Sequence, residues 1–234
     1  MKKILALIIV LFIGSVLGTA YALVESPSKD TLVTSARTLV AYNFTRSIEF
    51  NQYYVHVIEQ NGVRKVMKDL TYIGKVITVG HIDMRKETVK AMEEFYVNGT
   101  LLTRAQVIVN LNTGEIKGNI MLNNGTTMDL TEFWSQYYGI EKDEAITMFE
   151  DNLPMIAFRR LVLNSTGLSR IQLQLSTTDR ILMGLGLKER LFAYRFTSPS
   201  GKEWTVLVNS RGIPVRFESQ DKDLKVTVVV QPFE

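Results

Sequence analysis

The chain has 234 residues, of which 46% are hydrophobic, a formal net charge of +3 at pH 7, and no cysteine. This length and apolar content describe a folded chain with a sizeable core, and the missing cysteine excludes disulfides, thiol chemistry and a lipid-modified N-terminal cysteine. The charge excludes a strongly basic nucleic-acid-binding surface. Two of the 27 basic residues, Lys2 and Lys3, lie at the N-terminus, and the rest of the chain is close to neutral.

Residues 1–24 have the pattern of a secretory signal peptide. Lys2 and Lys3 precede a long apolar run, and Ala20-Tyr21-Ala22 near its end is a small-x-small cleavage site. The uncharged run is also long enough to span a bilayer as a retained anchor. Both alternatives export residues 25–234, so we expect an extracellular or cell-surface protein, held at the membrane if the segment is not cleaved.

The exported part begins with a predicted helix and a long strand. Residues 29–41, preceded by Ser26-Pro27-Ser28, have the apolar spacing of a capped helix. In the strand that follows, the parity of the apolar residues changes near Asn51-Gln52, which predicts a bulge. Asn61-Gly62 then predicts a two-residue hairpin turn.

Turn signals recur over the next 65 residues, with strand-forming runs such as 72–79 and 105–111 between them. The signals are Gly74, Gly80, Asn98-Gly99, Asn112-Thr113-Gly114 and Asn124-Gly125. Residues 89–97 also suit a helix, but we predict a strand. Because parallel strands need long crossovers, these short connections predict an antiparallel meander.

A helical insert is predicted at about residues 129–165. Asp129 can cap a short aromatic helix over residues 130–138, which Gly139 interrupts; an acidic helix follows over 141–150, and Pro154 starts a third over 155–163.

Strand signals resume after the insert, where apolar and polar residues alternate over 171–175. Residues 181–187 predict a loop or short helix. The remaining strands are predicted at 191–197, 203–209, 213–218 and 224–230. This order predicts an α+β fold in one exported domain, a curved antiparallel sheet (an open half-barrel) with helices packed on one face.

The sequence offers little support for catalysis. His81 and Asp83 share a strand face, but no third metal ligand and no Gly-x-Ser-x-Gly motif accompanies them. The carboxylates between residues 141 and 151 suit a solvated helix face. We therefore expect no catalytic residue, no metal site, no cofactor and no enzyme activity. A hydrolase would require His81 and Asp83 beside a third polar group in a cleft.

Aromatic and methionine residues are abundant in the segments between the strands. Packing against the sheet is one explanation for them, and the alternative is a cavity between sheet and helices that suits an acyl chain. The candidate cavity residues are Phe133, Trp134, Tyr137, Met148, Met155, Phe158 and Met183.

Four N-x-Ser/Thr sequons are candidate glycosylation sites in an exported protein. Their asparagines are Asn43, Asn98, Asn124 and Asn164. The alternative is that these are turn residues and carry no glycan.

The order of elements resembles the LolA-type lipoprotein-carrier superfamily. The residues that carry the resemblance are the early helix running into the strand at 42–50, the Asn61-Gly62 hairpin, and the closing strands over 204–217 and 225–233. Members are exported and share an open, strongly curved antiparallel half-barrel covered by helices. The resemblance implies binding of a lipid or a lipid-modified protein between sheet and helices, without catalysis. The long insert and the sequons depart from the family pattern.

The sequence therefore predicts an exported, non-enzymatic binding protein that holds a lipid or other apolar ligand between sheet and helices. Its expected partners are that ligand or a lipid-modified protein, and the membrane through an uncleaved N-terminal segment, but no nucleic acid. The alternative is a structural or adhesive cell-surface protein without a ligand cavity.

Overall fold

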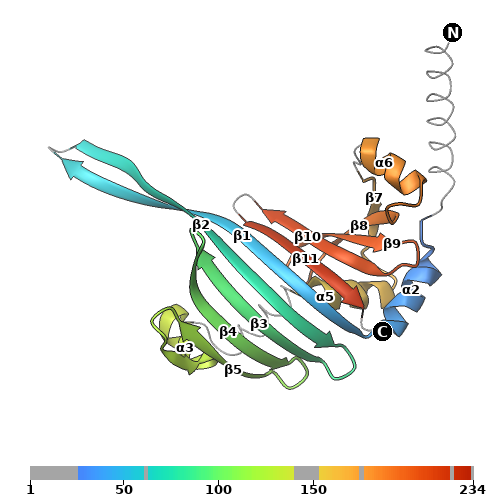
Figure 1. The fold of residues 1–234 in the computed structure, drawn as a ribbon, viewed down its shortest axis with the longest axis horizontal. Coiled ribbons are helices and arrows are strands. Elements are labelled where there is room, and N and C mark those ends of the chain that lie inside the picture. Colours follow the sequence, from blue (N-terminus) through green and yellow to red (C-terminus); the bar gives the residue numbers. More distant parts are fainter. Residues whose placement is uncertain (1–25, 61–62, 140–152, 174–176, 222–223, 233–234) are drawn as a thin grey trace, which may run out of the picture.

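Eleven strands form one antiparallel sheet in the computed structural model, which describes residues 26–60, 63–139, 153–173, 177–221 and 224–232. The strands are β1 (Ala41–Gln60), β2 (Val63–Asp83), β3 (Thr88–Val97), β4 (Thr100–Asn110), β5 (Glu115–Leu122), β6 (Thr127–Asp129), β7 (Ser169–Ile171), β8 (Leu191–Thr197), β9 (Glu203–Asn209), β10 (Pro214–Asp221) and β11 (Leu224–Pro232). Their order across the sheet is β6-β5-β4-β3-β2-β1-β11-β10-β9-β8-β7 (Figure 1). This confirms the predicted curved, open antiparallel sheet with helices.

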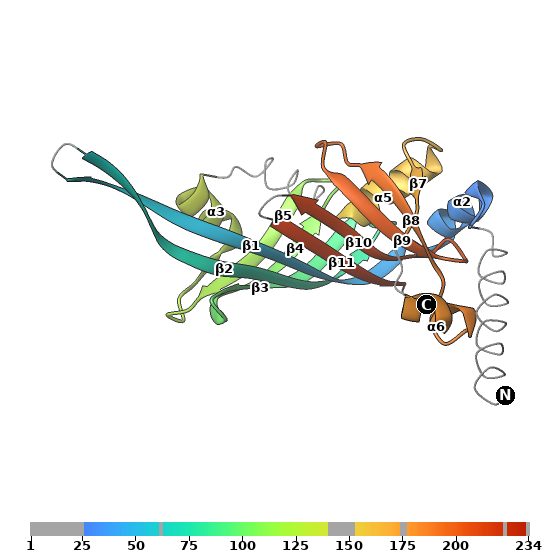
Figure 2. The same cartoon turned by 90° about the horizontal axis from the view of Figure 1, so that it is seen from above.

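The strand order shows how the chain builds the sheet. Strands β1–β6 pair in sequence in one half and β7–β11 in the other, and the pairing of β1 with β11 joins the halves. The segment between β6 and β7 therefore connects the two edges. Its helices α3 (Leu130–Tyr138) and α5 (Pro154–Leu163) lie on the same side of the sheet, with α2 (Lys29–Thr38) beside α5 (Figures 1 and 2).

Local chemistry explains where these helices begin and end. The Ser28 hydroxyl accepts a hydrogen bond from the Thr31 amide at 3.1 Å and caps α2. The Asp129 carboxylate accepts from the Thr131 amide at 2.8 Å and caps α3, which ends where Gly139 adopts a left-handed φ of 64°. Helix α5 starts at Pro154, whose missing N–H is not needed in a first turn. None of the helices in the described residues is long and apolar enough to cross a membrane.

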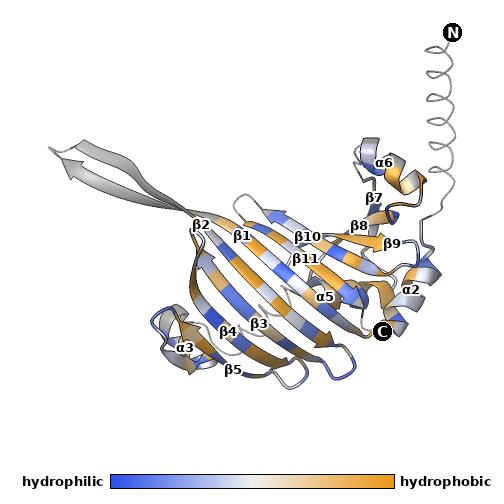
Figure 3. Cartoon of the chain, in the orientation of Figure 1, coloured by the Kyte–Doolittle hydropathy of each residue, from blue (hydrophilic) through white to orange (hydrophobic). Residues whose placement is uncertain are grey.

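The strand register defines two faces of the sheet. Phe158 of α5 packs against Phe196 and Phe217, with ring centroids 5.9 and 5.7 Å apart, so we call this the inner face. Phe217 pairs with Val228, which pairs with Arg46, and directly paired residues lie on the same face. Hydrophilic and hydrophobic residues alternate along β3, β4 and β5 (Figure 3), because one side is packed and the other is wet.

The β1–β2 hairpin extends beyond the rest of the sheet. Strand β11 pairs with residues 42–50 of β1, and β3 pairs with residues 74–83 of β2. Residues 51–60 and 63–72 pair only with each other within the described chain, and they form a two-stranded arm (Figure 1).

Two glycines that the sequence analysis assigned to turns lie inside strand β2. An added Cβ atom would lie 2.1 Å from the Phe50 ring at Gly74 and 2.6 Å from the Phe44 ring at Gly80. Each glycine pairs with that phenylalanine across β1. The missing side chain makes room for an aromatic ring, which is the other common reason for glycine within a strand.

Several boundaries also differ from the predictions. The β1–β2 register shifts at Tyr54/Val55, not at Asn51-Gln52. Helix α2 ends at Thr38, short of residue 41, because Leu39 is already extended. Strand β7 stops at Ile171, and a helix, α6 (Thr177–Gly184), overlaps the predicted loop or short helix at 181–187.

The predicted strands at 89–97, 191–197 and 203–209 are confirmed to within one residue. The Asn61-Gly62 turn, the acidic helix over 141–150 and the segment 1–24 lie outside the described residues.

The buried phenol of Tyr42 makes stability depend on alkaline pH. Desolvation raises the pKa of Tyr42 from 10.0 to about 12, against a smaller lowering effect of Arg159. This stabilising contribution is complete below the unfolded-state pKa and is lost as pH rises through the folded-state pKa, because the unfolded chain ionises first. The two-unit difference corresponds to about 2.7 kcal/mol. In urea denaturation between about pH 9 and about pH 12, we expect Tyr42→Phe to lose less unfolding free energy than the native chain. Equal losses would contradict this assignment.

Candidate functional site

The inner face is buried at one end of β1–β3 and half-exposed at the other. Tyr42, Phe44 and Ile82 are buried in the core. Further along the same face, four apolar side chains are only half-buried. We call Ile48, Phe50, Val76 and Phe95 the apolar patch.

Register and a glycine explain how the apolar patch forms. Ile48 pairs with Val76, and Val76 pairs with Phe95, so three adjacent strands contribute to one surface. The Phe50 and Phe95 rings stack with centroids 5.9 Å apart and an interplanar angle of 18°. The Phe50 ring lies over Gly74, where a side chain would collide with it. The Phe50 ring therefore covers the position of a Gly74 side chain, and the Phe95 ring lies nearly parallel to it.

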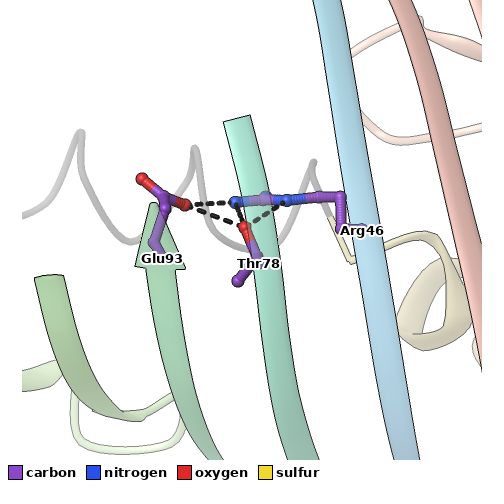
Figure 4. Close-up of polar contacts among 3 residues, drawn as sticks. All are labelled: Arg46, Thr78 and Glu93. Atoms are coloured by element: carbon purple, nitrogen blue, oxygen red, sulfur yellow. Dashed lines mark hydrogen bonds and ion pairs between the residues drawn. The ribbon is translucent and has the colours of Figure 1, made fainter. Parts of the chain in front are cut away.

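A polar network separates the apolar patch from the buried end. Arg46 lies between Phe44 and Ile48 on the inner-facing parity of β1, and its side chain is 7% exposed. Its Nη2 donates to Glu93 Oε2 at 2.6 Å, and Nε and Nη2 donate to Thr78 Oγ1 at 3.2 and 2.9 Å. The Thr78 hydroxyl in turn donates to Glu93 Oε2 at 3.0 Å (Figure 4).

The network crosses three adjacent strands in one row. Arg46 pairs with Thr78, and Thr78 pairs with Glu93. A buried guanidinium without an anion is strongly destabilising. Glu93 is therefore the partner that permits Arg46 to be buried on the inner face. The Glu93 side chain is 37% exposed, so one end of the network reaches solvent.

The described residues that were predicted to line a cavity do not surround one common cavity. Met155 and Phe158 are buried on α5, which packs on α2 and β10. Phe133 is buried and Trp134 half-buried on α3, which packs on β5 and β6. Met183 of α6 is buried outside that core. The Tyr137 side chain and Met148 lie outside the described residues.

Sequence reasoning missed the polar network and the strand residues of the apolar patch. A signal for Arg46 was present, because it shares the strand parity of Tyr42, Phe44, Ile48 and Phe50. A charged residue on an apolar parity needs a buried partner. Nothing in the sequence named Thr78 and Glu93 as that partner, because their position depends on the register of β2 and β3.

His81 and Asp83 lie on the outer face, opposite the apolar patch. His81 Nδ1 lies 3.1 Å from Asn43 Oδ1. The Asp83 carboxylate accepts hydrogen bonds from the amides of Lys86 and Arg85 in the β2–β3 turn, and these bonds lower the pKa of Asp83. Within the described ranges, no group of three or more potential metal ligands is found.

All four sequon asparagines are exposed. Asn98 Oδ1 accepts from the Ile73 amide at 3.0 Å, and Asn124 Oδ1 accepts from the Thr126 amide at 2.9 Å. Asn164 follows the last residue of α5. Their exposure is what glycosylation requires, and glycosylation itself stays a prediction.

Three surface pockets lie away from the apolar patch. One of about 470 Å³ lies beside α2 at Ser35 and Arg211. One of about 310 Å³ lies at Pro27 and Tyr194. The third, of about 400 Å³, lies on the outer face at Ile77. None of the five predicted cavity residues whose side chains the structure describes lines any of the three.

Comparisons with known proteins find solved structures with a distant likeness to this chain and identify no family. No protein-family model and no curated protein matches the chain. One similar solved structure is a beta-barrel-like protein of a domain of unknown function (DUF1849) from Brucella abortus, with 10% identity over 84% of this chain and 99% of that chain, and a TM-score of 0.34. Another is a DUF1329 family protein from Desulfovibrio piger, with 10% identity over 88% of this chain and 92% of that chain, and a TM-score of 0.31.

Proposed function

We propose that this chain is an exported, non-enzymatic binding protein that holds an apolar ligand, such as a lipid acyl chain, on the apolar patch. The observation that carries the proposal is the half-exposed state of Phe50, Phe95 and their neighbours on the face that bears the helices. This proposal includes the LolA-like mode of binding implied by the sequence resemblance. Export rests on the pattern of residues 1–24.

Burial energetics favour an apolar occupant for this surface. Each Å² of apolar surface removed from water stabilises by about 25 cal/mol, and each buried methylene group by about 0.8 kcal/mol. The sheet leaves stacked aromatic rings half-exposed beside a fully buried core. A flexible hydrocarbon chain laid on these rings would bury that surface without any change in the sheet.

The polar groups beside the apolar patch favour binding over catalysis. The Thr78 hydroxyl accepts from Arg46 and donates to Glu93, so its hydrogen bonds are made within the protein. His81 and Asp83, the pair that a hydrolase would require, lie on the opposite face.

Uptake of a fluorescent fatty acid tests the proposal, together with extraction of lipid from the purified protein. We expect Phe95→Gln to weaken uptake about tenfold, which corresponds to about 1.4 kcal/mol. Met92→Gln is the matched control, because Met92 lies on the outer face of the same strand and is 40% exposed; its uptake should equal that of the native chain. No uptake and no co-purifying lipid would contradict the proposal.

The two-stranded arm of β1 and β2 favours a second candidate, a structural or adhesive cell-surface protein. Its unpaired strand edges can pair with another chain. Sedimentation velocity on the same samples distinguishes the two: self-association that rises with concentration, in a protein that takes up no ligand, would support this second candidate.

A further inference from the structure

We infer that the ligand of the apolar patch is an amphiphile with an anionic head group, a carboxylate or a phosphate, and that Arg46 binds this head in exchange for Glu93. This inference rests on the proposed function and specifies its ligand. It concerns the polar network of Arg46, Thr78 and Glu93 on the inner face.

The network and the apolar patch lie beside each other along three strands. Arg46 is two residues from Ile48, Thr78 two from Val76, and Glu93 two from Phe95. Since side chains two residues apart lie on the same face about 6.6 Å apart, the row of polar groups runs directly alongside the row of apolar groups. A molecule with an apolar tail and a charged head matches both rows at once.

The two charges of the network differ in how easily they can separate. The Arg46 side chain is 7% exposed and the Glu93 side chain 37% exposed. Glu93 can therefore turn toward water and be solvated, whereas Arg46 remains buried and needs an anion close by. An incoming carboxylate or phosphate supplies that anion when Glu93 leaves.

Arg46 also has hydrogen-bonding capacity left for a ligand. Its contacts use Nε and Nη2, and Nη1 has no partner among the described residues. A guanidinium presents five N–H donors in a planar fork that matches the oxygens of a carboxylate or phosphate. Displacing Glu93 would free the fork to make two parallel hydrogen bonds to one head group.

The surroundings give the ion pair no evident structural purpose. In the same cross-strand row, Val228 and Phe217 lie on one side of Arg46, and Ala105 and Ile120 lie beyond Glu93. An apolar residue at position 46 would continue this row, and a buried ion pair stabilises a fold no better than a well-packed apolar pair. A ligand that uses the charge would explain a charged pair within this apolar row.

The test compares dodecanol, dodecanoate and dodecyl phosphate, which share one tail, as competitors of a fluorescent fatty acid. The protein is taken from the exported fraction of the expressing host. We expect the native chain to bind both anions about tenfold more tightly than dodecanol. Arg46→Met should remove this preference, so that the two anions bind no more tightly than dodecanol does. Glu93→Gln should tighten binding of the anions about tenfold, because the competing carboxylate is gone.

A matched control lies one residue away. Glu94 pairs with Arg104 at 2.7 Å on the outer face, so Glu94→Gln removes a carboxylate from the same strand without touching the apolar patch and should change none of the affinities. Thermal denaturation of each variant checks folding. If Arg46→Met does not fold, the tighter anion binding expected of Glu93→Gln and the unchanged binding expected of Glu94→Gln still test the inference.

The outcomes separate the inference from the proposed function. Tighter binding of dodecanoate than of dodecyl phosphate would support a fatty acid, and the reverse would support a phosphate head group. Equal binding of all three competitors, unchanged by Glu93→Gln, would overturn the inference and leave the proposed function standing. Binding of none of them would contradict the proposed function itself.

Discussion

Replacing Phe217 by alanine is expected to lower the free energy of unfolding by about 3–5 kcal/mol, the usual cost of removing a buried aromatic ring. Phe217 is 0% exposed. Its ring meets Phe158 at 5.7 Å and Phe196 at 6.3 Å, both edge-on, which is a favourable geometry for aromatic pairs. The substitution therefore opens a cavity where α5, β8 and β10 meet, and strands on both sides prevent the site from collapsing.

Urea denaturation measures this effect from the transition midpoint at an unchanged slope. Gln220→Ala is the control, because Gln220 is exposed on the same strand and should change stability by less than about 0.5 kcal/mol. A loss below about 1 kcal/mol for Phe217→Ala would show that this aromatic cluster does not hold α5 on the sheet.

The strands that the sequence predicted well end at turns that have a local signal. The strands predicted at 191–197 and 203–209 have the same bounds as β8 and β9. Gly201 follows β8 and Gly212 follows β9, and their φ angles of 86° and 75° mark turns that need a left-handed residue. In these cases the turn chemistry and the alternation of apolar residues lie within a few positions of each other.

The two glycines of β2 show where local signals fail. Gly74 and Gly80 carry the same residue type as a turn, but each serves a phenylalanine more than twenty residues earlier in the chain. Only the register of β1 against β2 brings the ring and the glycine together. A pattern read along the chain contains no information about such a contact.

The strand residues of the candidate site were not predicted, for the same reason. The apolar parity that contains Phe50 was visible in the sequence, and so was the single charge on it, Arg46. The predicted cavity residues were helical ones instead, and of these Met155 and Phe158 belong to the packed core. Residue type alone does not distinguish a side chain that fills a core from one that lines a cavity.

Replacing Gly118 by alanine is expected to destabilise the fold by about 3 kcal/mol, at the upper end of the range for overpacking. Gly118 lies in β5 opposite Val107, and an added Cβ atom would lie 2.0 Å from the backbone oxygen of Gln106. A side chain could rotate away from such a contact, but a carbonyl of the β4 ladder can move only if the strands separate.

Hydrogen exchange and urea denaturation distinguish this effect from a general loss of strand propensity. In Gly118→Ala, the amides of β4 and β5 should exchange faster than those of β9 and β10. Asn119→Ala is the control, because Asn119 is exposed on the neighbouring, outward-facing position of β5, and we expect a change of less than about 0.5 kcal/mol. If Gly118→Ala and Asn119→Ala are equally stable, β4 and β5 can move apart at residue 118 without a cost in free energy. A marked loss of stability in Gly118→Ala would instead show that the close approach of the β4 and β5 backbones holds this edge of the sheet. Helix α3 packs on the same edge.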